Sequence, residues 1–435
     1  MEAQEHIRRD VPVVVNYCDF SVDWDFVDFK RRMAELECAG CITAYRGFHP
    51  HSLGPNLYAY LREENNYLLE IREKYCFTPD RMNEYASSGT YYFRSGDLLL
   101  RYFQKAIERG LHTNGEFYAS SPYNLLIEDG LDVYIYELRR MLQWGTPEDL
   151  EEYLAWSDYF LRTNERGPAK PAAGATLIPM AGAGERFARE GWSEPKPLVP
   201  VAGVPMIERA LRALPRSSRW VAVCQQGHLH DPRLSSVLHE GRDLEIIGID
   251  GVTQGQVCTC LLARDTIDPE QPLLVAPCDA ALIIDESQYA TLIDDPTTDC
   301  LIWTFRNHPH ANRNPRQYGW VRAAADGTAL EILCKVAPPD PVKDAPGITG
   351  AFWFRKARFL WEAADALIAQ DRRVNHEFYA DSAIQVLIEQ RRRARVFPVK
   401  HFICFGTPDD VRTFEYWEGH FREARRPIAA AAAAP

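Results

Sequence analysis

The sequence lacks several features that would place it in a specialised class of protein. No run of residues approaches the about 18 consecutive apolar residues of a membrane span, and the N-terminal "MEAQEHIRRD" lacks the apolar segment of a signal peptide. Basic residues are not in excess, because the formal net charge is -12. A wide nucleic-acid-binding face needs net positive charge. We therefore expect a cytoplasmic protein with no membrane and no nucleic-acid partner.

The eleven cysteines do not complete a metal-binding pattern. Cys38 and Cys41 have the spacing of zinc ligands, but no second CxxC motif supplies the other two ligands. In a cytoplasmic protein these residues are expected to be thiols rather than a disulfide framework. The two His-Pro-His triads, which begin at His49 and His308, are expected to be surface turns rather than zinc sites.

The sequence contains a partial internal repeat. "SSGTYYFR" at Ser87 matches "ITGAFWFR" at Ile348, "NGEFYA" at Asn114 matches "NHEFYA" at Asn375, and "GTPEDL" at Gly145 matches "GTPDDV" at Gly406. Each pair is 261 residues apart, and chance similarities would not stay in register. We expect an incomplete repeat at 1–162 without the glycine-rich loop, a linker at 163–174, a complete domain at 175–424 and a disordered tail at 425–435.

Strands and helices alternate along the complete copy. Its strands are nearly continuous apolar runs, which is typical of a parallel sheet covered by helices on both faces. The expected fold class is α/β: a Rossmann-like three-layer α/β/α domain with a mixed, mainly parallel sheet, preceded by a partial repeat of the same fold. Ligands of such sheets bind at the carboxyl ends of the strands.

A glycine-rich loop follows the first strand of the complete copy, in "LIPMAGAGERFAREGWSEPKPLVPV". Gly182 and Gly184 would let backbone N–H groups approach an anion, because no side chains intrude. Arg186 offers a planar fork for phosphate oxygens, and Lys196 offers a mobile point charge. The loop matches neither GxGxxG nor GxxxxGK[ST]. Together the two cations suit a triphosphate; the alternative is an ordinary strand–turn–helix junction.

The longer pattern GxGxRF…PKPLxPVxGxPMI, which continues through Ile207, resembles the NTP transferase family and, within it, the sugar-1-phosphate nucleotidylyltransferases. The resemblance implies catalytic roles for Arg186, Lys196 and Asp279, with Mg²⁺ held by Asp279. It also implies two sets of binding residues. Those for the nucleotide are Met180, Ala181, Gly182, Ala183, Gly184, Gln254 and Gly255. Those for the phosphorylated acceptor are Lys335, Thr349, Gly350 and Glu377.

The implied reaction is attack of a sugar-1-phosphate, or a similar small phosphate, on the α-phosphorus of an NTP. Pyrophosphate leaves and an activated NDP-sugar forms. Two other readings stay open: a non-catalytic nucleotide- or sugar-phosphate-binding regulatory protein, and a cytidylyltransferase that uses a non-sugar phosphate such as phosphocholine.

The sequence departs from the family pattern at two places. The lead-in to Gly406, "HFICFG", contains no acid, so the metal site rests on Asp279 alone or borrows Asp285 or Glu377. The family's Glu-Lys pair is kept as Glu73-Lys74 in the first copy but becomes Cys334-Lys335 in the second. A carboxylate that would bind sugar hydroxyls is thus replaced by a thiol. As structural alternatives, Asp279 caps a strand end and Glu377 complements a helix dipole.

The first copy begins at the strand "VPVVV", which would be an open sheet edge. Three interpretations follow. The gene start is misassigned; the copy docks on the complete copy or forms a homo-oligomer; or it is a sugar-phosphate-binding or regulatory module without catalysis.

Overall fold

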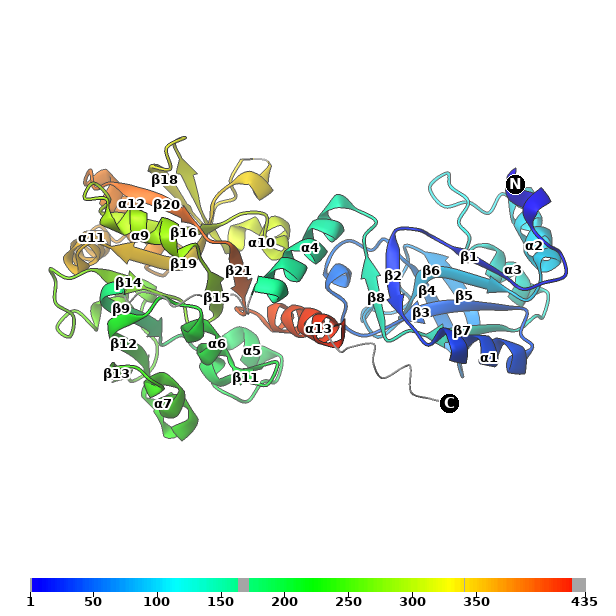
Figure 1. The fold of residues 1–435 in the computed structure, drawn as a ribbon, viewed down its shortest axis with the longest axis horizontal. Coiled ribbons are helices and arrows are strands. Elements are labelled where there is room, and N and C mark those ends of the chain that lie inside the picture. The colour runs from blue at the N-terminus through cyan, green and yellow to red at the C-terminus, as the bar shows by residue number, and fades with distance from the viewer. Residues whose placement is uncertain (1, 163–171, 340, 425–435) are drawn as a thin grey trace. The chain divides into compact units, whose positions relative to one another are not determined.

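The computed structural model describes residues 2–162, 172–339 and 341–424 (Figure 1). Its chain divides into two compact units, Met1–Leu154 (unit 1) and Ala155–Pro435 (unit 2), and helix α4 (Pro147–Arg162) contains the boundary. Residues 163–171 of the expected linker and all of the expected tail lie outside the described residues. The helices of the described segments are all too short or too polar to cross a bilayer.

The main sheet of unit 2 is mixed, with parallel pairing in its first half. Its strands, in spatial order, are β13 (Leu244–Ile249), β12 (Ser217–Gln225), β9 (Ala172–Met180), β14 (Leu273–Val275), β19 (Gly347–Phe354), β16 (Cys300–Phe305) and β20 (Ala394–Pro398). β9 is parallel to β12 and β14, whereas β19 is antiparallel to β14 and β16. A hairpin of β17 (Gly319–Ala323) and β18 (Ala329–Cys334) joins β19.

Two short ribbons accompany this sheet. β15 (Ala280–Ile283) pairs with β21 (His401–Cys404), and β10 (Pro200–Val201) pairs with β11 (Val204–Pro205). The first ribbon matters for the site, because it begins directly after Asp279 and ends at Cys404.

Helices cover both faces of the sheet, because successive residues of its strands are apolar. Leu177 and Ile178 are both fully buried but belong to two different cores. The core around Leu177 includes α8 (Gln256–Leu261), α11 (Ala357–Ala369) and α12 (Ala380–Glu389); that around Ile178 includes α6 (Met206–Arg212), α7 (Pro232–His239) and α9 (Glu286–Asp294). This is the expected three-layer α/β/α arrangement (Figure 1). Outside these layers lie α5 (Glu185–Arg189), α10 (Pro309–Arg313) and α13 (Pro408–Ala424).

Unit 1 has a six-stranded sheet of its own. Its order is β1 (Val13–Asn16), β6 (Tyr85–Phe93), β3 (Gly40–Tyr45), β7 (Val133–Glu137), β5 (Tyr67–Glu73) and β4 (Ala59–Glu64), and β2 (Phe20–Asp23) pairs with β8 (Arg140–Gln143). The core around Ile42 includes α2 (Gly96–Glu108) and α3 (Pro122–Glu128), and the core around Cys41 includes α1 (Phe26–Leu36). Cys38 and Cys41 are buried, and all eleven cysteines are free thiols.

The two sheets agree in order and direction over part of their width. The path β1-β6-β3-β7 pairs antiparallel, antiparallel and parallel, as does β14-β19-β16-β20. The ribbon β2–β8 likewise corresponds to β15–β21. Among the described strands, β1 pairs with β6 alone, whereas β14 has β9 as a second neighbour.

Candidate functional site

The glycine loop lies at the carboxyl end of β9, where the sequence places it. Met180 and Ala181 are buried, Gly182 and Ala183 are exposed, and Gly184 has a φ of 66°, which starts α5 from a left-handed conformation. The side-chain amide of Gln225, at the end of β12, donates to the carbonyls of Ala181 (3.1 Å) and Gly182 (3.2 Å). Gln225 therefore fixes the loop, and sequence analysis did not single it out.

Lys196 and Asp279 meet at the loop, although 83 residues separate them. The Lys196 ammonium donates to Asp279 Oδ2, and the two side chains are 21% and 28% exposed. Burial is the largest single influence and acts to lower the pKa of Lys196, but the charge and hydrogen bond of Asp279 together with Cys278 and Cys404 outweigh it, so the net pKa is raised. A Cβ on Gly184 would lie 3.1 Å from the Cβ of Lys196, so the glycine lets the loop approach the lysine closely. The lysine is therefore a fixed cation beside the loop.

Arg186 is exposed on α5. Its charge acts on Tyr318, whose pKa is raised first by burial and then by Cys404 and Asp410, with Arg186 opposing. The Tyr318 hydroxyl also lies 3.3 Å from His310 Nδ1. Tyr318 is therefore influenced both by Arg186, on the helix after the loop, and by Cys404, which is itself influenced by Asp279. Sequence analysis did not name Tyr318, and it treated His310 only as part of a surface turn.

Cys404 stands where the sequence lacks an acid. Burial, followed by the charges of Asp410 and Asp279, raises the pKa of the Cys404 thiol well above its usual value. The protonated thiol cannot act as a second carboxylate. Asp410 caps α13 by accepting hydrogen bonds from the backbone and hydroxyl of Thr407, and its Oδ1 lies 3.0 Å from His310 Nδ1.

The two sequence candidates for a second metal ligand are engaged elsewhere. Asp285 caps α9 through the N–H groups of Ser287 and Gln288 and pairs with Lys400 at 3.0 Å. Glu377 is exposed and hydrogen-bonds Tyr379. Within 2–162, 172–339 and 341–424, no group of three or more His, Cys, Asp or Glu side chains could hold a metal ion. The donor set suits a cation that Asp279 and phosphate oxygens share, as is usual for Mg²⁺.

Gly350 brings the backbone of β19 to the strand that carries Asp279. It has a φ of 87°, and a Cβ there would lie 3.6 Å from Pro277, two residues before Asp279. The Thr349 hydroxyl donates to the Trp303 carbonyl at 3.1 Å inside the core. Only the backbone of Thr349 and Gly350 is therefore presented toward the Asp279 side.

Lys335 directly follows β18 and has a φ of 57°, a strained conformation for a lysine. Its ammonium donates to the Gln317 carbonyl and lies 5.2 Å from the centre of the Tyr379 ring. Lys335, Tyr379 and Glu377 therefore form one cluster, built from the hairpin and the turn before α12. Among the described residues, no hydrogen bond or ion pair joins this cluster directly to Asp279.

The turn at Gln254 and Gly255 packs on the same segment. Phe378 donates its N–H to the Gln254 carbonyl at 2.9 Å, and Gly255 has a φ of 127° against the Phe378 backbone. The Gln254 side-chain carbonyl accepts a hydrogen bond from Arg373 at 2.8 Å. The proposed nucleobase turn thus adjoins the proposed acceptor turn.

The prediction that the His-Pro-His triads are surface turns is wrong. His49 is 2% exposed, and its Nε2 accepts a hydrogen bond from the Met141 N–H. His308 caps α10 by accepting from the Ala311 N–H, and burial lowers its pKa to about 4. The ring centres of His49 and Tyr45 lie 4.4 Å apart and those of His308 and Phe402 lie 5.1 Å apart, so both histidines pack against aromatic side chains of their own unit.

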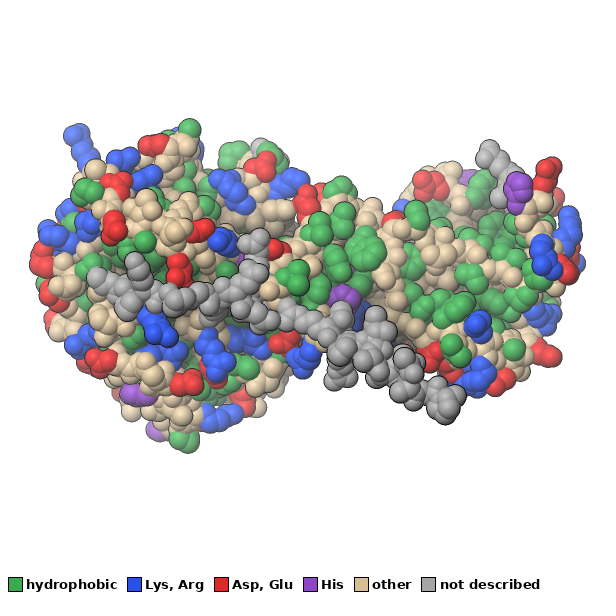
Figure 2. Space-filling view, viewed as in Figure 1, with side chains coloured by type: hydrophobic (Ala, Val, Ile, Leu, Met, Phe, Trp, Pro, Cys, Tyr) green, Lys and Arg blue, Asp and Glu red, His purple; other side chains and the backbone are tan. Residues whose placement is uncertain are grey.

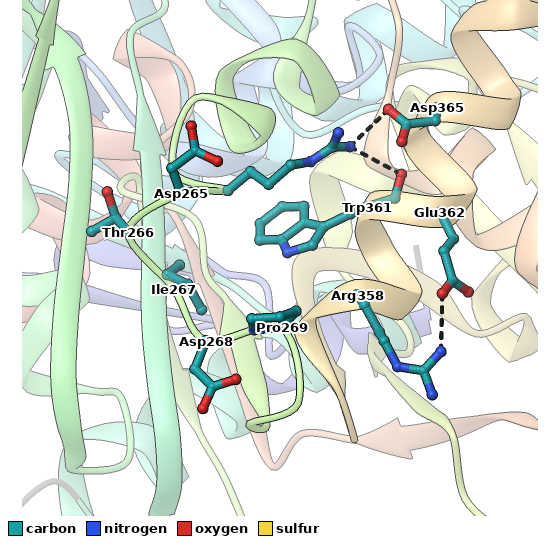
Figure 3. A pocket seen from close by; sticks show the side chains of 10 residues that line it. Asp265, Thr266, Ile267, Asp268, Pro269, Arg358, Trp361, Glu362 and Asp365 are labelled. Carbon is teal, nitrogen blue, oxygen red and sulfur yellow. Dashed lines mark hydrogen bonds and ion pairs between the residues drawn. The ribbon is translucent and has the colours of Figure 1, made fainter.

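A hollow of about 510 Å³ lies elsewhere in unit 2, between the segment 264–269 and helix α11 (Figure 3). This segment leads into the amino end of β14, whereas Asp279 follows its carboxyl end. The two arginines that line the hollow are paired with carboxylates: Arg264 donates to Asp365 at 2.7 Å, and Arg358 donates to Glu362 at 3.0 Å. On the visible face of unit 2, cationic and anionic side chains are likewise intermixed (Figure 2). The cations beside the glycine loop therefore remain the better anion site.

Part of unit 2 matches a known protein family. Residues 176–375 match the family described as "MobA-like NTP transferase domain". The chain is similar to the solved nucleoside-diphosphate-sugar pyrophosphorylase from Vibrio cholerae RC9, with 17% identity over 55% of this chain and 99% of that chain and a TM-score of 0.45. It is also similar to the inositol-1-phosphate CTP transferase from T. maritima, with 14% identity, 58% and 97% coverage and a TM-score of 0.45. Curated protein sequences gave no match.

The family match covers 200 of the 435 residues and places the similarity to the MobA-like NTP transferase domain in unit 2.

Proposed function

We propose that unit 2 transfers a nucleoside monophosphate from an NTP to a sugar-1-phosphate or a similar small phosphate. The observation that carries this proposal is the meeting of Lys196 and Asp279 beside the glycine loop, at the carboxyl ends of β9 and β14. A loop for phosphates and a carboxylate for a cation are what the transfer needs in one place.

In the proposed reaction an oxygen of the acceptor phosphate attacks the α-phosphorus of the NTP. The new O–P bond forms as the bond to the β-phosphate oxygen breaks, and pyrophosphate leaves with that electron pair. Both reactants are anions, so the protein contributes alignment and charge neutralisation rather than acid–base or covalent chemistry.

The residues of the loop divide this work. The backbone from Met180 to Gly184 lines the nucleotide, and Gln254 with Gly255 faces the base. When the NTP binds, the Lys196 ammonium leaves its ion pair with Asp279 and binds the α- and β-phosphates. Arg186 holds the departing pyrophosphate. A bound Mg²⁺ would neutralise charge that develops on the phosphates. Asp279 is the side chain that would hold it.

On the acceptor side, Lys335 is proposed to bind the acceptor phosphate, with Glu377 nearby. The backbone of Thr349 and Gly350 is proposed to line the rest of the acceptor. The Lys335 ammonium donates to a carbonyl and forms no ion pair with a carboxylate among the described residues, so its charge can still attract a phosphate.

We also propose that unit 1 is a second, N-terminally incomplete copy of the same domain. The shared strand order and the constant 261-residue spacing support this interpretation. In unit 1 the place above Gly89, the counterpart of Gly350, is filled by Tyr17, with ring atoms 3.0 Å from where a Cβ would lie.

The decisive experiment is pyrophosphate release by the full chain across a panel of NTPs and phosphorylated acceptors. The panel contains hexose-1-phosphates, an inositol phosphate and phosphocholine, each with and without Mg²⁺. The proposal predicts release that requires one NTP and one acceptor together. NTP binding without release for every pairing would instead favour the regulatory interpretation.

A further inference from the structure

The two units differ at one matched pair of positions in a way that sequence comparison of either position alone does not explain. At the 261-residue spacing, Glu73 and Ser120 of unit 1 correspond to Cys334 and Asp381 of unit 2. In unit 1 the carboxylate lies on the strand and a hydroxyl lies at the helix, whereas in unit 2 a thiol lies on the strand and a carboxylate lies on α12. The carboxylate therefore lies on the strand in unit 1 and on the helix in unit 2.

In unit 1 the pair forms a direct contact. The Ser120 hydroxyl donates to Glu73 Oε1. Burial raises the pKa of Glu73, and the Ser120 hydrogen bond and the charge of Lys74 oppose this rise. One carboxylate therefore lies beside the lysine that ends the strand.

In unit 2 the same lysine position finds its carboxylate on the helix. Burial raises the pKa of Asp381, and the charge of Lys335 opposes this rise. Burial and then the charge of Asp381 raise the pKa of the Cys334 thiol to about 12. Cys334 is therefore neutral at physiological pH, and at these two positions the carboxyl group on which the charge of Lys335 acts is Asp381.

A third position makes room for this exchange. Ala59 is the register partner of Glu73 in unit 1, and Gly319 is the partner of Cys334 in unit 2. A Cβ on Gly319 would overlap Asp381 Oδ2. The glycine is not in the left-handed region, so the space for Asp381, rather than backbone freedom, accounts for it.

We propose that Asp381 is the residue of unit 2 that recognises hydroxyl groups of the acceptor, beside the phosphate-binding Lys335. This inference rests on the proposed function for the identity of the pocket. The acceptor class it selects is a phosphorylated polyol, because a carboxylate accepts hydrogen bonds from neighbouring hydroxyls and a thiol does so weakly.

The test measures binding to the full chain by calorimetry without NTP, so that it does not depend on turnover. The probes are glucose-1-phosphate and myo-inositol-1-phosphate, with methyl phosphate as a ligand that has no free hydroxyl. Asp381→Asn is expected to weaken the two polyol phosphates about 10- to 100-fold, the usual cost of losing a charge-assisted hydrogen bond. Methyl phosphate should bind as before.

A swapped variant separates recognition from folding. Cys334→Glu/Asp381→Ser places the unit 1 pair in unit 2 and is expected to recover at least part of the lost polyol affinity. Glu389→Gln, which removes an exposed carboxylate at the other end of α12, is the matched control and should change nothing. NTP affinity and the thermal midpoint of each variant report on folding.

The outcomes distinguish the two proposals. If the wild type binds polyol phosphates no more tightly than methyl phosphate, or if Asp381→Asn leaves their affinity unchanged, the role of Asp381 is overturned. If the wild type binds them through Asp381 but releases no pyrophosphate with any NTP, the role of Asp381 stands and the proposed function fails.

Discussion

Replacing Asp279 by Asn should change nucleotide binding and turnover in opposite directions. In the free protein Asp279 competes for the ammonium of Lys196, which the proposed mechanism needs for phosphates. Asn removes the competing charge with little change in shape. Metal-free NTP should therefore bind more tightly, while Mg²⁺-dependent turnover should fall because the carboxylate for the cation is lost.

The size of the binding effect follows from the exposure of the pair. The side chains are only 21% and 28% exposed, so the attraction is screened less than at the surface. At an effective dielectric of ~20 two charges about 4 Å apart attract by about 4 kcal/mol, and desolvation offsets much of this. A net value of about 1–2 kcal/mol corresponds to NTP binding about 5- to 30-fold tighter. Turnover should fall at least ~100-fold, as when one transition-state charge contact is lost.

Calorimetry with NTP in EDTA measures the first effect, and pyrophosphate release with Mg²⁺ measures the second. Asp294→Asn, an exposed change in the same unit, is the control for the added amide. Turnover within tenfold of the wild type would remove Asp279 from the metal site. Unchanged metal-free affinity would show that Lys196 does not reach the phosphates.

The other predictions concern the second cation, the metal, one buried histidine and the glycine beside Asp381. Arg186→Ala should lower kcat at least ~100-fold in pyrophosphate release while the fold, followed by circular dichroism, is unchanged; near-normal kcat would contradict its role. Chelation by EDTA should abolish release, and added Mg²⁺ should restore it; activity that survives EDTA would contradict the metal assignment. Burial lowers the pKa of His49 from 6.5 to about 4, so between these pH values the unfolded chain binds a proton that the folded chain does not bind. The free energy of unfolding should therefore fall as the pH drops from 6.5 toward 4. Urea titrations should show a slope of up to about 1.4 kcal/mol per pH unit that His49→Gln reduces, and an equal slope in the variant would refute this cause. Gly319→Ala should lower the free energy of unfolding by about 1–3 kcal/mol, because the added Cβ would overlap Asp381 Oδ2. The loss should be smaller in an Asp381→Ser background, where that carboxylate is absent. Equal losses in both backgrounds would show that the Asp381 carboxylate does not clash with the added Cβ.

The fold class and the position of the loop could be predicted because they depend on local patterns. Alternating apolar runs specify the strands of unit 2, and Leu177 and Ile178 indeed face opposite layers. The glycine loop and Asp279 both follow such runs, so their nearness at the carboxyl ends of parallel strands was expected and is found. Their catalytic roles stay predictions.

The surroundings of Asp279 could not be predicted, because they assemble from distant segments. Tyr318, His310 and Cys404 meet only when the α10 region packs against the β15–β21 ribbon. The histidine triads misled for a related reason: a polar triplet beside proline is typical of a turn, and only tertiary packing decides that His49 is buried. Gln225 left a weak signal, a polar residue directly after an apolar strand.

Asp381 illustrates what an internal comparison adds. The change from Glu73 to Cys334 by itself suggests a lost acceptor site, since a thiol cannot replace a carboxylate. A second carboxylate added beside Glu73 would place two like charges in one largely buried pocket, which is unfavourable for both. At these two matched positions each unit has one carboxyl group, and Lys74 or Lys335 opposes the rise in its pKa. Each unit therefore has one carboxyl group at these two positions, on the strand in unit 1 and on the helix in unit 2. Because Gly319 has no Cβ, the Asp381 carboxylate has room beside it. A pocket that had merely lost its function would have no need of that space.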